Sequence, residues 1–354
     1  MQGDGGSARG RTLAFVVLVV VCAAGVIGYA WLTRRTTADA ASAVAVTDPG
    51  EIARIAAGPH LLFRHTAVDR AYGKLAVVPL DAPDGPRVVT ALSCERTYFA
   101  GGVGVCLAAD RGIVTSYKLL LFDASYNARM TTPLAGMPSR ARVSADGSRA
   151  ALTYFVSGDS YAAASFSTRT FLIDPQSDTA LANLEDFAVT RDGARFKSVD
   201  FNFWGVTFAA EHDKFFATLS SAGTMYLVEG DARTRSARVL RAGVECPSLS
   251  PDNRRIAFKR RMPGVRLHWR LHVLDLISGV ETPLAEERSV DDQVEWLDDR
   301  TILYALPAAQ TSASSDVWAV PADGGGAPRI LVPNADSPSV VRPRGDTEHA
   351  GPKR

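Results

Sequence analysis

The chain has 354 residues, of which 39 are basic and 38 are acidic. This length is enough for one large domain or two ordinary ones. The near balance of charge excludes a general electrostatic argument for nucleic-acid binding, and no run of basic residues is interleaved with aromatic ones.

The first predicted element is an apolar N-terminal helix. Residues 13–33 contain no charged side chain, and two arginines lie on each side of them. About 20 apolar residues match the hydrocarbon thickness of a bilayer, and the run is longer than the apolar region of a usual signal peptide. We therefore predict an uncleaved transmembrane anchor at 13–33. The alternative is a cleaved signal peptide, with Ala-Ser-Ala at 41–43 as the cleavage site.

The arginines that flank the anchor do not decide its orientation, because the two sides carry equal numbers. We expect residues 1–12 to stay in the cytoplasm as a short flank, so that the long C-terminal part is exported. Residues 34–57, rich in Thr, Ala, Ser and Asp, are predicted to be a linker, and residues 344–354 a disordered tail. The predicted location is the cell membrane, with a single crossing and an extracytoplasmic domain.

A β-rich segment recurs six times over residues 58–343. Each copy ends in an acidic or equivalent turn position, and successive copies lie roughly 40 to 55 residues apart, which is typical of propeller blades. The six segments are 74–81, 117–123, 168–174, 224–231, 271–276 and 316–323.

The stretch CPSLSPDNRRIAF at 246–258 is the best-preserved copy of a turn that precedes these segments. Asp252 and Asn253 favour a turn, because both side chains can bond nearby backbone and tolerate left-handed geometry. The apolar residues that follow suit a buried strand. At the ends of the domain, 60–66 supplies an inner strand alone and 337–343 an outer strand alone, so we expect the two ends to complete one blade.

These patterns predict an all-β fold, a six-bladed β-propeller preceded by a single N-terminal transmembrane helix. No stretch after the anchor has a sustained helical period. A two-sheet sandwich is the alternative, but it does not explain a sixfold unit. Stacking six blades in a ring buries each face on a neighbour. We expect Phe258 and the equivalent residues to be core positions: Cys106, Leu152, Ala217 and Tyr304.

The stretches 246–258, 142–152 and 271–284 resemble the repeats of the TolB-type six-bladed propeller, a WD40-like unit. That unit has a Ser-Pro-Asp-Gly turn, an apolar strand, and then a strand that ends in Asp and a Gly turn. The resemblance covers about residues 58–343 and implies a cell-envelope module that contacts proteins across the mouth of the ring. TolB carries an α/β domain before its propeller, whereas this chain has the apolar segment and linker there.

The sequence offers no residue that we assign as catalytic or as a metal ligand. The nearest match to a Gly-x-Ser-x-Gly elbow, around Ser160, lacks its last glycine. His268 and His272 share a strand face, but a solvated blade strand explains them better than a zinc site. Asp291–Asp292 present oxygen ligands of the kind calcium prefers, but we do not assign a calcium site to them. We predict no cofactor. The Arg-Gly-Asp triplet at 344–346 lies in the polar tail, where chance explains it.

Two further groups of residues are candidates. Cys94 and Cys106 are predicted to form a disulfide in an oxidising compartment, and two small buried residues are the alternative. Loops on a rigid scaffold often carry binding residues. We therefore single out five aromatic residues as binding-loop candidates: Tyr126, Tyr161, Phe201, Phe203 and Trp204. The alternative for the FNFWG stretch is an extra packed strand.

The predicted function is a non-catalytic, membrane-anchored extracytoplasmic propeller that serves as a binding scaffold for a protein or ligand of the cell envelope. Nucleic acid is not an expected partner. The alternative is a propeller hydrolase or lactonase with a metal in the central channel. The strands that we expect to line the channel offer His65, Lys259 and Arg260 but few acids, which argues against a calcium site.

Overall fold

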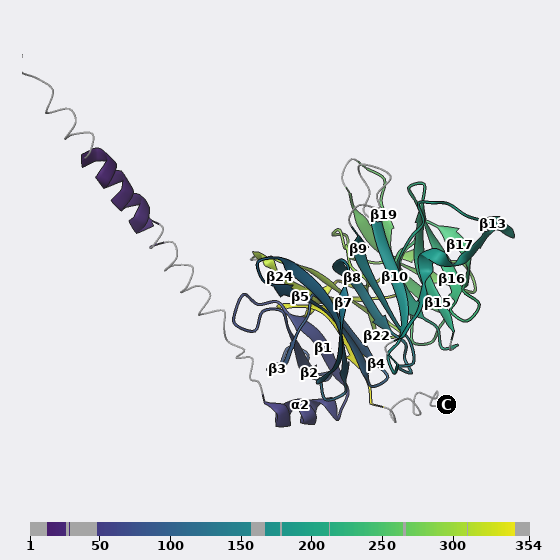
Figure 1. Ribbon diagram of the computed structural model, residues 1–354, viewed down its shortest axis with the longest axis horizontal. Coiled ribbons are helices and arrows are strands. Elements are labelled where there is room, and N and C mark those ends of the chain that lie inside the picture. The colour runs from purple at the N-terminus through teal and green to yellow at the C-terminus, as the bar shows by residue number, and fades with distance from the viewer. Residues whose placement is uncertain are drawn as a thin grey trace, which may run out of the picture. The chain divides into compact units, whose positions relative to one another are not determined.

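The structure is a computed structural model that describes residues 13–25, 28, 48–156, 167–177, 179–211, 213–264, 267–309 and 311–343. The chain divides into two units, residues 1–44 and 45–354. In the first unit, residues 13–25 form an exposed helix (Figure 1).

Much of the predicted N-terminal organisation falls outside the described residues. Residues 1–12, all of 26–33 except Gly28, and the predicted tail at 344–354 are not described. In the described part of the chain, no helix combines the length and the apolar character needed to cross a membrane.

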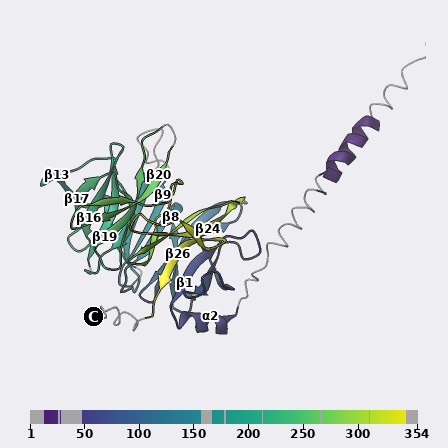
Figure 2. The same cartoon turned by 180° about the vertical axis from the view of Figure 1, so that it is seen from behind.

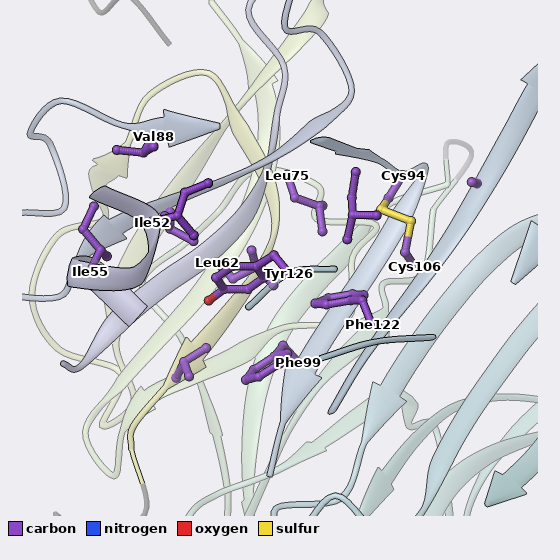
Figure 3. Close-up of a cluster of buried hydrophobic side chains, with 14 residues drawn as sticks. Ile52, Ile55, Leu62, Leu75, Val88, Cys94, Phe99, Cys106, Phe122 and Tyr126 are labelled. Carbon is purple, nitrogen blue, oxygen red and sulfur yellow. A yellow bond between two sulfur atoms is a disulfide. The ribbon is translucent and has the colours of Figure 1, made fainter. Parts of the chain in front are cut away.

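The last part of the predicted linker is a helix that belongs to the second unit and packs within it. α2 (Pro49–Ala56) begins after Asp48, whose carboxylate accepts hydrogen bonds from the next backbone N–H groups at 2.9 and 3.4 Å. Ile52 and Ile55 are buried in an apolar cluster that contains Leu62 and Leu75 (Figure 3). The linker prediction was therefore wrong for these residues. Two buried positions in eight residues give too short a period to recognise from sequence.

Six sheets, seen from both sides in Figures 1 and 2, make up the rest of the second unit. We name them blades 1 to 6 and give their strands in sheet order. Blade 1 is β26 (Ala335–Val341), β1 (His60–His65), β2 (Lys74–Pro79) and β3 (Val88–Ser93), and blade 2 is β4 (Arg96–Ala100), β5 (Val103–Arg111), β6 (Thr115–Asp123) and β7 (Ala128–Leu134). Blade 3 is β8 (Met137–Val143), β9 (Ala150–Val156), β10 (Ser167–Asp174) and β11 (Thr179–Asn183), and blade 4 is β14 (Asn202–Phe208), β15 (Lys214–Ser221), β16 (Thr224–Asp231), β17 (Ser236–Ala242), β12 (Ala188–Arg191) and β13 (Ala194–Phe196). Blade 5 is β18 (Glu245–Leu249), β19 (Arg255–Arg261), β20 (Trp269–Asp275) and β21 (Glu281–Pro283), and blade 6 is β22 (Glu295–Asp298), β23 (Thr301–Ala308), β24 (Thr311–Pro321) and β25 (Arg329–Val332).

The arrangement confirms the all-β six-bladed propeller. The first strands of the six blades contact one another in a closed ring, in the order β26, β4, β8, β14, β18, β22 and back to β26. They are therefore the inner strands around the central channel. Blades 1 and 4, 2 and 5, and 3 and 6 lie opposite each other. The expected core positions, Phe258 and its equivalents, are all buried.

The sequence placed the inner strands incorrectly. Residues 60–66 and their equivalents form the second strand of each blade, and the C-terminal segment expected as an outer strand belongs to the inner strand β26. The second strands are the most apolar because they are buried between neighbouring blades; β1 is buried at all six positions. The inner strands face the channel and carry more polar residues, so their pattern is weaker.

The two ends of the propeller complete blade 1, as expected. β26 pairs antiparallel with β1, with Leu61 opposite Val340. The Arg64 guanidinium donates to Asp336 Oδ2 at 3.0 Å across this seam. Arg87 donates to the carbonyl oxygens of the two residues before β26, at 2.6 and 3.0 Å. The ring is therefore closed by side chains as well as by the strand pairing.

The repeated turn joins the first and second strands. Ser250 Oγ donates to Asp252 Oδ1 at 2.5 Å and accepts from the Arg255 N–H at 3.0 Å. The same two contacts recur in blade 3, around Ser144, at 2.6 and 3.0 Å. Asn253 has a φ of 56°, a left-handed conformation that Asn tolerates. The prediction of a repeated turn before a buried strand is confirmed.

Candidate functional site

A buried polar cluster spans the central channel. Arg142 on β8 donates through Nη1 to Glu295 Oε2 on β22 at 2.5 Å. Its Nη2 donates to the Val294 carbonyl at 3.0 Å and to Ser248 Oγ at 3.3 Å. The Tyr98 hydroxyl donates to both Glu295 oxygens, at 3.0 and 3.1 Å, and its ring lies under the guanidinium, 4.3 Å from ring centroid to Arg142 Cζ. Inner strands of four blades are thus joined.

Burial sets the protonation of this cluster. Burial raises the pKa of Glu295 above its ordinary value, although the Arg142 charge opposes the rise. Burial and the Glu295 charge raise the pKa of Tyr98, so its hydroxyl stays a donor. The cluster occupies the channel between two cavities, one at each end of the inner strands.

The first cavity, which we call the mouth pocket, has a volume of about 540 Å³. It lies where the inner strands begin, since Arg96, Met137 and Glu245 line it. The β5–β6 hairpin of blade 2 and the β19–β20 hairpin of blade 5 border it from opposite sides of the ring. Described aromatic residues in its wall are Tyr117, Phe155, Trp204 and Trp269.

Charged side chains fill the blade 5 side of the mouth pocket. Lys259 Nζ forms an ion pair with Asp291 Oδ1 and lies 4.0 Å from Glu245 Oε2. Its Nζ is 4.5 Å from the centroid of the Trp269 ring, a cation–π distance. Trp269 Nε1 in turn donates to Glu245 Oε1 at 3.0 Å. The lysine is buried, so these contacts hold its charge in place.

Asp291 links this group to blade 3. Its Oδ1 lies 3.5 Å from Arg140 Nη2. Burial raises the pKa of Asp291, but the neighbouring cations, Lys259 foremost, outweigh it and hold this pKa below its ordinary value. This carboxylate, considered for calcium from the sequence, is therefore engaged by cationic side chains. Among the residues that the structure describes, no group of three His, Cys, Asp or Glu side chains is placed to hold a metal ion.

The second cavity lies at the other end of the inner strands and has a volume of about 740 Å³. Arg142 and Glu295 contribute to its lining, as does the repeated turn near Asn253. Tyr126, one of the candidate aromatics, lines it and is itself buried, with its hydroxyl bonded to His60 Nε2. Tyr126 therefore belongs both to the lining of the second cavity and to the apolar cluster of Figure 3.

The structure brings few of the other predicted site residues to a cavity. The FNFWG stretch is not a loop: Phe203 and Trp204 lie in β14, the inner strand of blade 4, and only Trp204 lines the mouth pocket. Phe203 is fully buried, and Phe201 packs against Phe196 with ring centroids 5.0 Å apart. Both phenylalanines are therefore packed, but β14 is the regular inner strand of blade 4 and not the extra strand of the alternative. Tyr161, like Ser160, lies outside the described residues.

The two candidate cysteines and His272 pack against neighbouring side chains inside the propeller. Cys94 and Cys106 are joined by a disulfide with a Cα–Cα distance of 5.4 Å, inside the apolar cluster of Figure 3. His272 is buried beside Phe258, and its Nδ1 lies 2.8 Å from Glu281 Oε1. His268 lies just before β20.

The residues that fill the channel were missed by sequence reasoning, although a signal exists. Arg142 precedes the turn residue Ser144 by two positions, and Ser248 precedes Ser250 by two. Positions at this offset belong to inner strands, so a charged residue there marks a side chain that faces the channel.

Comparisons with known proteins give the fold alone. No protein-family model matches the chain, and no curated protein matches it in sequence. Among solved structures, the chain is similar to TolB from Acinetobacter baumannii, with a TM-score of 0.57, 14% identity, and coverage of 81% of this chain and 67% of that one. A chain of a nidogen/laminin complex matches with a TM-score of 0.52, 12% identity, and coverage of 80% and 98%. Identities this low show a shared propeller architecture.

Proposed function

We propose that the chain is a non-catalytic scaffold that binds a protein or another cell-envelope component at the mouth pocket. One observation carries the proposal. Ile113 and Val114 at the tip of the β5–β6 hairpin are exposed, and so is Leu267 between β19 and β20. Leu267 lines the mouth pocket, and Ile113 and Val114 lie between Arg111 and Thr115, which line it from the opposite blade. An apolar patch beside charged groups is typical of a recognition surface.

We further propose that residues 13–33 anchor the chain in the cell membrane and that the propeller lies outside the cytoplasm. The apolar run at 13–33 and the disulfide between Cys94 and Cys106 support this location, because disulfides persist in oxidising compartments. Labelling of single-cysteine variants with a membrane-impermeant reagent tests it. A cysteine at exposed Ile277 that reacts only after permeabilisation overturns the extracytoplasmic assignment.

Site-specific photocrosslinking tests the binding surface. A photoreactive residue at Ile113 is expected to capture a partner from the native envelope. The matched control is Ile277, an isoleucine that is also exposed but lies in the β20–β21 turn, at the other end of β20 from Trp269 in the pocket wall. The captured product should also fall when Val114 and Leu267 are replaced by Ser. Equal capture from both positions, or none from either, contradicts the proposal.

A further inference from the structure

Arg140 lines the mouth pocket, and its guanidinium, which also interacts with the Cys246 side chain, keeps one donor without a hydrogen-bond partner within the ranges that the structure describes. Its side chain is 14% exposed, and Nη1 donates to the carbonyl of its own neighbour, Ser139, at 2.9 Å. The acidic oxygen that it faces, Asp291 Oδ1, is 3.5 Å away, beyond a good hydrogen bond. The buried Nε has no hydrogen-bond partner among the described residues. A guanidinium carries five donors, and an unmade bond to a buried donor is unfavourable.

The residues that line the mouth pocket carry an excess of positive charge. The described lining residues include five cations and three acids: Arg96, Arg111, Arg140, Lys259 and Arg261 against Glu95, Glu245 and Asp291. The whole chain has a net charge of +1, so positive charge is enriched in this cavity. A focused positive potential raises the local concentration of anions.

The acids of the wall are already engaged. Glu95 is bonded to Arg111 at 2.8 Å and lies 3.8 Å from Arg64. Glu245 accepts from Trp269, and Asp291 is held by Lys259. Arg96 donates from Nε to the neutral Ser139 carbonyl at 3.0 Å. Arg96 and Arg140 therefore share a carbonyl acceptor where an oxyanion would bond both more strongly.

The volume of the mouth pocket and its aromatic lining residues indicate which kind of molecule could carry the anionic group. A volume of about 540 Å³ lies within the range of small-molecule pockets, roughly 300 to 1,000 Å³. Trp204 and Trp269 are among its lining residues, and Lys259 Nζ lies 4.5 Å from the centroid of the Trp269 ring. The cavity thus suits an aromatic or apolar group that bears one charged end.

We propose that Arg140, with Arg96 and Lys259, forms a subsite for the oxyanion of a carboxylate or phosphate monoester whose apolar body lies against Trp204 and Trp269. This subsite rests on the proposed function, since it specifies the ligand chemistry of the same pocket. Asp291 is 57% exposed and contacts both Lys259 and Arg140. Its carboxylate occupies the position of the ligand oxyanion and competes with it.

The proposal makes opposite predictions for two substitutions. Arg140→Gln removes the paired N–H donors of the guanidinium and lowers the affinity for an anion at least tenfold. Asp291→Asn removes the competing charge and raises that affinity several-fold. Arg140→Lys keeps the positive charge but lacks the planar pair of N–H donors, so we expect an intermediate loss of affinity. The matched control is Arg238→Gln, an exposed arginine paired with Glu229 on blade 4, away from the pocket wall, which should leave affinity unchanged.

Benzoate, phenyl phosphate and the neutral benzamide are the probes. Calorimetric titration of the full chain gives affinity, and tryptophan fluorescence reports contact with the pocket. Benzoate or phenyl phosphate should bind at least tenfold more tightly than benzamide, and the tighter of the two identifies the oxyanion as carboxylate or phosphate. Equal binding of all three probes, or a folded Arg140→Gln variant with unchanged affinity for the anions, overturns the subsite.

Failure of the subsite and failure of the proposed function are distinguishable. If the probes bind without regard to charge while Ile113 still captures a partner, the oxyanion subsite alone is wrong. If benzoate binds through Arg140 but Ile113 and Ile277 capture nothing, the scaffold function is wrong and the pocket remains an anion site.

Discussion

Arg142 on blade 3 and Glu295 on blade 6 come from opposite sides of the ring, and their side chains meet in the channel with Nη1 and Oε2 2.5 Å apart. Both side chains are buried. The pair therefore links the two halves of the propeller directly, in addition to the contacts between neighbouring blades. Both residues line the second cavity, and neither lines the mouth pocket.

Replacing one partner of this pair should cost much more than replacing both. Arg142→Met leaves the Glu295 carboxyl buried without its cation, and we expect a loss of about 3–5 kcal/mol in the free energy of unfolding. The double variant Arg142→Met/Glu295→Met should recover most of that loss, because no buried charge remains. Urea titration of the single and double variants measures both. Additive losses in the double variant would contradict the argument.

An exposed pair on the outer part of blade 4 provides the control. Arg238 and Glu229 lie 2.5 Å apart, but the arginine is exposed. Arg238→Met should change the free energy of unfolding by about 0–1 kcal/mol, as is typical of surface ion pairs.

The disulfide should contribute to stability through the unfolded state. Cys94 and Cys106 enclose a short loop, with a sequence separation of 12 residues. A loop of this size predicts a loss of about 2–3 kcal/mol in the free energy of unfolding when both cysteines are replaced by Ala. A reducing agent should lower wild-type stability by a similar amount and leave the variant unchanged. A chain with Cys22 and Cys246 replaced by Ser should keep the response; if it does not, the effect comes from another thiol.

The architecture could be predicted because its determinants are local. The Ser250–Asp252 turn is made by side chains two residues apart, and the apolar strand after it is buried wherever the unit recurs. The closure of blade 1 could be predicted because the repeat leaves one unpaired strand near each end of the propeller domain, at 60–66 and at 337–343. The inner strands were misplaced because apolar pattern favours the most buried strand, and β1 is buried on both faces.

The site could not be predicted in the same way, because it depends on ring closure. Arg142 and Glu295 are far apart in sequence and meet only because blades 3 and 6 are opposite. Lys259 was noted as a channel residue, but its partner Asp291 lies in the connection between blades 5 and 6. Sequence periodicity reports which face of a strand is apolar and carries no information on which charges face each other across a channel.

Glu185 should make stability depend on pH. It lies in η1 (Leu184–Asp186) and accepts hydrogen bonds from the backbone N–H groups of Thr170 and Phe203, at 3.1 and 3.2 Å. Burial raises the pKa of Glu185 to about 7 despite these bonds. A folded pKa above the unfolded value of about 4.3 means that the protonated form is favoured by folding. The resulting stability is complete below pH 4 and is lost as the pH rises through 7.

Comparison with Glu185→Gln isolates this contribution. Between pH 4 and pH 8 the wild type should lose about 3–4 kcal/mol relative to the variant, the scale set by about 1.4 kcal/mol for each pKa unit. Urea titrations at a series of pH values measure the difference. A constant difference between the two proteins across this range would show that Glu185 titrates normally.

α2 should protect the segment that precedes the propeller from proteolysis. The side chain of Arg54 in α2 is exposed, so trypsin is limited there by the helical backbone, which must unfold locally before cleavage. Ile52 and Ile55 hold the helix on blade 1. Ile52→Ser with Ile55→Ser should therefore speed cleavage after Arg54 while the propeller, whose six blades keep their strand pairing, remains folded. The rate of appearance of the cut product, followed by mass spectrometry, measures the effect. Glu51→Gln, which disturbs only the exposed ion pair with Arg54, should change the rate little. An equal rate in the isoleucine variant and the wild type would mean that packing on blade 1 does not hold α2 in place.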